Sequence, residues 1–411
     1  MSIFTLISTL FTIAVMVSYI NHRYIKLQST IAITIAAVLI SLCLMIAAHL
    51  GFSNMEKYFT YVLHKLDFHH LLMHGMLSFL LFAGALTIDL SDLRSQKWEI
   101  TILALLGTII STFIIGWLTF YLLQFLGQGL PMIYCMLFGA LISPTDPIAV
   151  LAIFRKVGAP RSLDSLLAGE SLFNDGVGVV LFLTIYQMAF NGEAVTAQHV
   201  ISLFIHQAAG GIVYGILLGY LGYWLIKGID HYVLEIFITL GITTGGYTLA
   251  QAIDISGPLA MVVAGIFIGN HKKLFHMKAK TRQNIEVFWE VIDMALNALL
   301  FLLIGLELNL IKVSWFEIAA GLAAIIITLL ARTITVGGPL FIMGKKKKRI
   351  PFTIPIMVWG GLRGGLAIAL ALAIPYGHPR EILLPMAYAV VIFSIIVQGL
   401  TVKYLVAKTK P

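Results

Sequence analysis

Two acids and an amide lie close together in the apolar stretch AGESLFNDGVGVV at residues 168–180. On a helix, Ser171 and Asp175 are four residues apart and share one face, and Glu170 and Asn174 share another. The hydroxyl and carboxylate of the first pair are oxygen ligands for a cation, and the carboxylate can also carry a proton. The second pair can brace the helix against a neighbour. A charge at the centre of a bilayer costs about 3 kcal/mol or more, so acids in a membrane helix indicate function by default.

A second stretch, LISPTDPIAV at residues 141–150, combines an acid with two prolines. Pro147 has no N–H, so the carbonyl of Ser143 loses its helical partner. Asp146 precedes a proline and is therefore driven from helical geometry towards an extended one. Unpaired carbonyls are tolerated at membrane depth only where they line a protein-enclosed, watered cavity. The stretch predicts an unwound segment with free oxygens, an acid and Thr145 near the middle of the bilayer.

A third stretch, WGGLRGGLAIAL at residues 359–370, is loosened by four glycines and carries Arg363. If this segment crosses the one at residues 141–150, Asp146 faces the positive ends of the interrupted helices and Arg363 faces the negative ends. The two charges would then compensate the dipoles that broken helices leave. We therefore expect Arg363 to act on helix dipoles rather than to bind an ion.

Arg332 is another cation inside an apolar segment, LLARTITV at residues 329–336. Breaking a buried ion pair leaves one uncompensated charge and is strongly destabilising. We therefore expect Glu170 and Arg332 to form a buried, structural pair. Glu307, near the end of an apolar segment, fits an acid at the membrane interface.

The composition indicates that membrane helices hold these residues. Hydrophobic residues make up 59% of the 411 residues, charged residues only 11%, and mean hydropathy is +0.96, which excludes an ordinary soluble domain. A helix needs about 20 mostly apolar residues to cross the hydrocarbon core. Thirteen such spans are expected, near residues 2–20, 29–50, 71–90, 99–126, 132–154, 165–190, 199–226, 232–251, 257–270, 292–309, 315–343, 352–376 and 381–402.

The basic residues indicate the orientation, because cytoplasmic loops collect Lys and Arg. With the N-terminus outside, 21 of the 27 Lys and Arg residues fall in cytoplasmic loops or the C-terminal tail, and 4 fall on the other side. We therefore predict a multi-pass protein of the cell (inner) membrane with a cytoplasmic C-terminus. The same distribution accounts for the net charge of +8, so no nucleic-acid partner is expected.

The interrupted segments stand at corresponding places in the two halves of the chain, which is typical of inverted-repeat transporters. We expect a first six-helix repeat at residues 1–190, a linking helix at 191–230 and a second repeat at 231–411. Gly211, Gly215 and Gly219 lie one turn apart in the linking helix and predict close helix packing without chemistry.

SPTDP in one helix, GESLFND in the next, an arginine in the eleventh span and GGLRGGLA in the twelfth occur together and in this order. In this the chain resembles the NhaP and NHE branch of the monovalent cation/proton antiporters, over nearly its whole length. The resemblance implies an NhaA-like fold with crossed broken helices, an ion-transporting core of spans 4–6 and 11–13, and a scaffold of spans 1–3 and 7–10 that forms a homodimer. It also implies exchange of Na⁺ (or Li⁺, sometimes K⁺) for H⁺ by a vertical, elevator-like movement of the core, without a cofactor.

The resemblance further implies a role for each polar residue. Asp175 would bind the ion and carry the proton, and Ser171 and the Thr145 backbone would be further Na⁺ ligands. Relatives with an Asn-Asp pair tend to be electroneutral, as expected if one carboxylate holds either one proton or one monovalent cation. The remaining roles are support of the unwound loop by Asn174, lining of the site by Asp146, pairing of Glu170 with Arg332, and dipole compensation by Arg363.

One feature departs from the family pattern. Many prokaryotic members carry a glutamate in the third span, where this chain has Ala83, Gly84 and Ala85, and the nearest acid is Asp89 at the end of the span. This difference leaves K⁺/H⁺ exchange open as an alternative to Na⁺/H⁺ exchange. A membrane-embedded aspartyl protease is a remote alternative, because its GxGD motif is absent, and a channel is another.

Two further groups carry no assigned role. The basic run KKKKR at residues 345–349 fits a topology anchor, although it also suits anionic lipids. A histidine group on the expected outer side fits a solvated loop, with a pH sensor or metal site as the alternative: His64, His69, His70 and His74.

Overall fold

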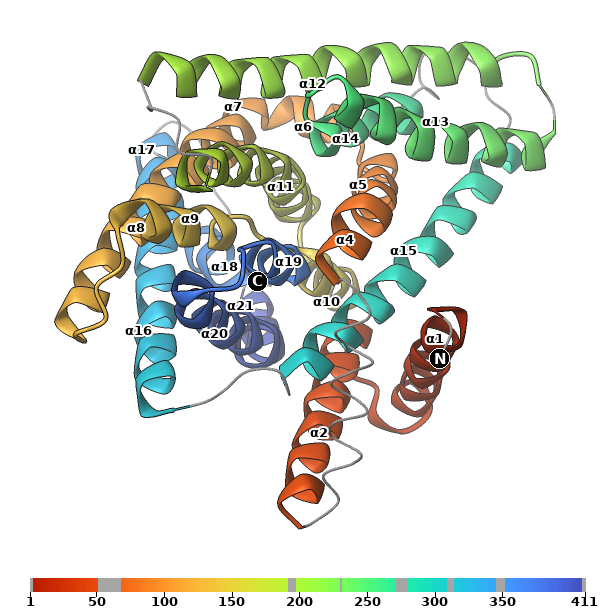
Figure 1. Ribbon diagram of the computed structural model, residues 1–411. Coiled ribbons are helices and arrows are strands. Elements are labelled where there is room, and N and C mark those ends of the chain that lie inside the picture. The colour runs from red at the N-terminus through yellow and green to blue at the C-terminus, as the bar shows by residue number, and fades with distance from the viewer. Residues whose placement is uncertain are drawn as a thin grey trace.

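The computed structural model describes residues 3–50, 68–190, 197–229, 231–270, 279–308, 314–344 and 352–408. Throughout this part of the chain the regular structure is helical, as predicted (Figure 1). Its helices are α1 (Ile3–Ile20), α2 (Ser29–His49), α4 (Phe68–Leu71), α5 (Leu77–Leu86), α6 (Leu90–Ser95), α7 (Lys97–Thr101), α8 (Thr108–Phe125), α9 (Met132–Ile142), α10 (Ile148–Val157), α11 (Arg161–Phe190), α12 (Ala197–Ile226), α13 (Tyr232–Ala252), α14 (Gly257–Asn270), α15 (Ala279–Glu307), α16 (Trp315–Arg332), α17 (Gly338–Gly344), α18 (Thr353–Gly360), α19 (Gly365–Leu372), α20 (His378–Phe393) and α21 (Gly399–Ala407).

Short π-helical turns join several of these helices into longer rods. A π-turn adds one residue to a helical turn and locally opens the backbone ladder. The described turns are η1 (Asn21–Ile25), η2 (Leu72–Met76), η3 (Ile102–Gly107), η6 (Thr333–Gly337) and η7 (Ser394–Gln398).

Nine helical rods in the described part of the chain are long and apolar enough to cross a membrane. The other four predicted spans correspond to shorter or interrupted helices, at residues 68–86, 132–157, 257–270 and 353–372. The multi-pass membrane architecture is therefore confirmed, while the count of thirteen spans and the inverted repeats remain predictions.

The two interrupted segments break where the sequence predicts. The prolines end α9 at Ile142, and α10 begins only at Ile148, after Pro147. The glycine-rich segment ends α18 at Gly360, and α19 begins at Gly365. Each break leaves four or five residues outside a helix, so the backbone groups there need other partners.

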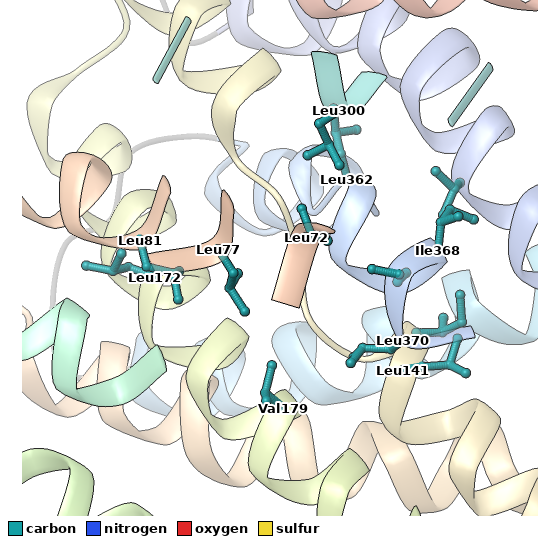
Figure 2. Packing of buried hydrophobic residues seen from close by; sticks show 14 of the residues in the cluster. Leu72, Leu77, Leu81, Leu141, Leu172, Val179, Leu300, Leu362, Ile368 and Leu370 are labelled. Atoms are coloured by element: carbon teal, nitrogen blue, oxygen red, sulfur yellow. The ribbon is translucent and has the colours of Figure 1, made fainter. Parts of the chain in front are cut away.

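The half-helices lie near the middle of the molecule, and α12 runs along one edge (Figure 1). The predicted glycine packing is confirmed, because a Cβ added to Gly211 or Gly215 would lie 2.7 Å from a backbone oxygen of Ser256 or Ala260, at or in α14. Buried leucines and isoleucines surround the half-helices, with Leu141 and Leu370 in adjacent positions (Figure 2). This apolar packing holds two backbone breaks at a fixed place in an otherwise regular bundle.

Candidate functional site

The two unwound segments run antiparallel and side by side. The backbone N–H of Asp146 donates to the carbonyl of Leu362 at 2.8 Å, which makes an isolated β-bridge between them. Asp146 is therefore extended, in agreement with the restriction that the following proline imposes. Segments more than 200 residues apart in the sequence meet at this crossing.

Arg363 contacts the carbonyls that the first break frees. Its Nη1 donates to the carbonyl of Pro144 at 2.7 Å and also to that of Ser143, the group that loses its partner to Pro147. Its backbone N–H donates to Ser394 Oγ at 2.9 Å. The guanidinium is almost fully buried and lies at the C-terminal end of α9, where a positive charge is favourable.

Asp146 lies at the opposite ends of the half-helices. Its Oδ1 accepts from the backbone N–H of Ile148, the first residue of α10, at 2.9 Å. The same carboxylate packs against Gly364, just before α19, so closely that a Cβ there would lie 2.8 Å from Asp146 Cγ. A glycine is required at this position, and Asp146 faces the positive ends of both half-helices.

A hydrogen-bond network ties the first unwound segment to α11. Asn174 Oδ1 accepts from the backbone N–H of Thr145 at 3.1 Å, and Asn174 Nδ2 donates to Thr145 Oγ1 at 2.8 Å. Thr145 Oγ1 also lies 2.9 Å from Ser171 Oγ. All three residues are buried, so this network fixes the position of the loop next to α11.

Glu170 and Arg332 form a buried ion pair between α11 and α16. Arg332 Nη1 and Nη2 donate to the two carboxylate oxygens of Glu170, the second at 2.8 Å. Nη2 also donates to the carbonyl of Met357 in α18 at 3.1 Å. Glu170 is fully buried, and the two-pronged geometry is the strong form of this pair. The pair thus connects three helices around the crossing.

Asp175 differs from every other charged group at the crossing. In the described part of the chain its carboxylate has no hydrogen bond and no ion pair, and it is only half-buried. The negative charge of Asp146 and the positive charge of Arg363 both act on it electrostatically, although neither group contacts it directly. Ser171, one turn earlier on the same helix, lies on the same face. A carboxylate that is held in place but unpaired has its oxygens available for a proton or a cation.

The third predicted span contributes no acid to this site. Ala83 and Ala85 are buried, and a Cβ at Gly84 would point to Leu172 of α11 at 3.9 Å. Asp89 instead caps the N-terminus of α6, where it accepts from the Ser91 N–H at 2.8 Å.

Two polar contacts of α15 are not predicted from the sequence. On α15, Asn297 Nδ2 donates to the carboxylate of Asp293 at 3.0 Å, an acid and amide at positions i and i+4 that the sequence shows plainly. At the other end of α15, Tyr388 of α20 donates to Glu307 Oε2 at 2.9 Å. The interfacial interpretation of Glu307 is wrong, because this side chain is buried between helices.

The remaining polar groups named from the sequence fall largely outside the described residues. The run at residues 345–349 is outside them, as is His64, and among the described side chains of the histidine group His70 is exposed. The part of the chain that is described contains no group of three His, Cys, Asp or Glu residues arranged for a metal ion.

Residues 11–408 match the family model of the sodium/hydrogen exchanger transmembrane domain. The chain belongs to the sodium/hydrogen exchanger family. The match covers both unwound segments, α11 and the Arg332 helix, which together form the site described above. The resemblance inferred from the motifs is thereby confirmed.

Relatives support the family across almost the whole chain. The Na⁺/H⁺ antiporter NhaP of Pseudomonas aeruginosa is 44% identical over 407 residues, which cover 98% of this chain and 96% of that protein. The Na⁺/H⁺ antiporter NhaH of Halobacillus dabanensis is 36% identical, with 91% of each chain covered. The sodium proton antiporter MjNhaP1 of Methanocaldococcus jannaschii, solved at pH 8, shares the fold with a TM-score of 0.76 at 20% identity over 98% of this chain and 97% of that one.

Proposed function

We propose that this exchanger-family protein is an electroneutral Na⁺/H⁺ antiporter in which Asp175 binds either one Na⁺ (or Li⁺) or one proton. The observation that carries the proposal is the state of Asp175. It is a half-buried carboxylate without hydrogen bond or ion pair in the described structure, one turn from Ser171 and next to an interrupted helix. The relatives named as Na⁺/H⁺ antiporters support the choice of ions.

The Na⁺ ligands would be oxygens from two elements. Asp175 and Ser171 supply a carboxylate and a hydroxyl from α11. The unwound segment supplies the backbone oxygen of Thr145, whose hydroxyl lies 2.9 Å from Ser171 Oγ. Asn174 holds Thr145 in position through two hydrogen bonds, so it supports the site without binding the ion. Asp146, which is fixed at the N-terminus of α10, adds negative potential next to the site.

Electroneutral exchange is expected because most charged groups at the crossing have fixed partners. Arg332 is paired with Glu170, and Arg363 donates to backbone carbonyls. Neither arginine is therefore available to neutralise Asp175 when the transported ion leaves. Asp175 carries the one described charge at the crossing that lacks such a partner. If the core moves only when this charge is neutralised, one Na⁺ exchanges for one H⁺.

The moving unit would comprise the helices of spans 4–6 and 11–13, and the scaffold those of spans 1–3 and 7–10. Within the scaffold, the glycines of α12 pack closely on α14, which supports a rigid body. The outer face of α12 exposes large apolar side chains that suit lipid or a second copy of the chain in a homodimer: Ile205, Ile212, Ile216, Leu217, Tyr220 and Trp224. We place the protein in the cell membrane with the N-terminus outside and the C-terminus in the cytoplasm.

The test uses proteoliposomes with a trapped pH dye and an acidic interior, to which Na⁺, Li⁺ or K⁺ is added outside. Na⁺ is expected to dissipate the pH gradient equally with and without valinomycin in K⁺-containing medium, because no net charge crosses. A lower external pH is expected to raise the apparent KM for Na⁺ at an unchanged maximal rate, since H⁺ competes for Asp175. Failure of every cation, or full activity of Asp175→Asn, overturns the proposal.

K⁺/H⁺ exchange is the second candidate. It is favoured by the apolar character of residues 83–85, which removes an acid that contributes to Na⁺ binding in many relatives according to the family pattern. In the same assay K⁺ alone would then dissipate the gradient. A membrane current in the absence of a pH gradient would instead identify a channel.

A further inference from the structure

Asp293 and Asn297 form a polar pair on α15 that the exchange mechanism above does not use. Asn297 Nδ2 donates to the Asp293 carbonyl at 2.9 Å and to Asp293 Oδ1 at 3.0 Å. Asn297 is 3% exposed, whereas Asp293 is half-buried. Asp293 lies inside the candidate membrane span Gln283–Glu307, where an acid is costly unless it has a cation or a task.

The pair lies on the face of α15 that leads to the crossing. Asp293, Asn297 and Leu300 follow the i, i+4, i+7 spacing of one helix face. Leu300 packs on the first residue of α19, since a Cβ at Gly365 would lie 2.6 Å from the Leu300 side chain. Leu300 and Leu362 of the unwound segment both belong to the buried apolar core drawn in Figure 2. Asp293 is therefore within about two turns of the crossing, and Asp146 acts on it electrostatically.

The side-chain amide of Asn297 has an oxygen, Oδ1, that accepts no hydrogen bond in the described structure. Asn297 Oδ1 is buried and has no hydrogen-bond partner among the described residues, which is costly for a polar atom in a protein interior. A half turn of the amide exchanges Oδ1 with the Nδ2 that now touches Asp293. The oxygen would then face the carboxylate, and the two groups would offer oxygens to one cation between them.

We propose that Asp293 and Asn297 form a second monovalent-cation site, through which the ion passes on its way to Asp175. The site gains a cation from the negative potential of Asp293 and Asp146 together, while Arg155 of α10, which also acts on Asp293, marks the predicted cytoplasmic end. Because the ligands are one carboxylate and one amide, the site is too weak to retain the ion and suits a transfer step. This inference rests on the proposed antiport function.

The test compares Na⁺ kinetics in proteoliposomes for the parent and four variants. Asp293→Asn is expected to raise the apparent KM for Na⁺ on the order of 10-fold at an unchanged maximal rate, because one negative charge on the path is lost. Asp293→Glu restores the KM, and Asn297→Ala raises it without removing a charge. Glu381→Gln is the control, since Glu381 is an exposed acid in the first turn of another helix, α20, and its loss leaves the KM unchanged.

Salt separates a site on the path from a purely structural role. The KM difference between parent and Asp293→Asn narrows as an impermeant salt screens the attraction, whereas a packing defect is insensitive to salt. An unchanged KM in Asp293→Asn overturns the inference, and so does a lowered maximal rate that Asp293→Glu fails to restore. If Asp293→Asn does not fold, Asn297→Ala and Asp293→Glu decide the matter by the same criteria. Asp175→Asn runs in the same series, and its full activity would overturn the antiport proposal itself.

Discussion

Glu170 and Asp175 are five residues apart on the same helix, but they differ in burial and in whether a partner compensates their charge. Glu170 is fully buried and holds Arg332 with both carboxylate oxygens. Asp175 is half-buried and has neither a hydrogen bond nor an ion pair in the described structure. Both are acids of one apolar helix, so their residue type alone does not separate them.

The difference shows which charge is structural and which is available for transport. A buried acid with a fixed partner contributes a constant charge, because separating the pair would leave an uncompensated charge in the protein interior. An acid without a protein partner can replace a bound proton by a bound monovalent cation at a low cost in free energy, because no ion pair is broken. The partner decides the role, and the partner of Glu170 comes from a helix 162 residues away.

The largest effect is expected from Asp175→Asn, which removes the available charge and leaves the fixed pair intact. Na⁺-driven dissipation of a pH gradient should fall to the level of empty liposomes. The melting temperature in detergent should stay equal to that of the parent or rise, because a half-buried charge without a partner in the described structure is lost. Residual Na⁺ transport above background would contradict the assignment of Asp175, and Asp164→Asn, at the start of the same helix, serves as the control.

Breaking the fixed pair should affect stability. Glu170→Gln or Arg332→Gln alone leaves one buried charge uncompensated, at a cost of about 3–5 kcal/mol, and should lower the melting temperature or abolish assembly. The double variant Glu170→Gln/Arg332→Gln removes both charges and should be more stable than the sum of the single effects predicts.

The double variant also sharpens the comparison with Asp175. Where it folds, its apparent KM for Na⁺ should stay near that of the parent, because the pair contacts α18 and not the proposed ion ligands. Additive single effects on the melting temperature would show that the pair does not act as a unit.

A smaller effect is expected from Arg363→Gln. The change leaves the carbonyls of Ser143 and Pro144 without their donor, at a cost of about 2 kcal/mol or more for two buried acceptors. Arg380 is a matched control, since it also donates to two carbonyls at a helix end but is less buried. Thermal unfolding of both variants should show a clear loss for Arg363→Gln and little change for Arg380→Gln. Equal losses of thermal stability in the two variants would show that the deeper burial of Arg363 does not increase its contribution to stability.

The smallest effect is expected from Thr145→Val. This nearly isosteric change removes the hydroxyl that links Ser171 and Asn174, a net loss of about 1 kcal/mol per hydrogen bond, and should raise the KM for Na⁺ several-fold. Thr184→Val is the control, because in the described structure the Thr184 hydroxyl bonds only to Val180 of its own helix. A KM equal to that of the parent would mean that the network does not position the ligands.

Much of the site could be predicted from local features. Proline and glycine break helices wherever they stand, so both interruptions and the extended geometry at Asp146 follow from a few neighbouring residues. Helix periodicity also puts Ser171 and Asp175 on one face. Asp293 and Asn297 were missed because an acid and an amide four residues apart also occur on ordinary polar faces. The neighbouring residues in the sequence do not indicate that this face of α15 points towards the two unwound segments.

The sequence by itself determined that the chain is an apolar, multi-pass helical protein with two interrupted helices and an acid beside an amide in α11. Hydrophobicity, chain breaks and helical spacing act over a few residues, so they do not depend on the rest of the fold. Only the tertiary structure decided which buried charges meet. It joined Arg332 to Glu170 and Arg363 to the carbonyls of the other break, and it buried Glu307 against Tyr388. These contacts depend on how helices from distant parts of the chain pack. Among the described residues at the crossing, they leave Asp175 as the acid with free oxygens.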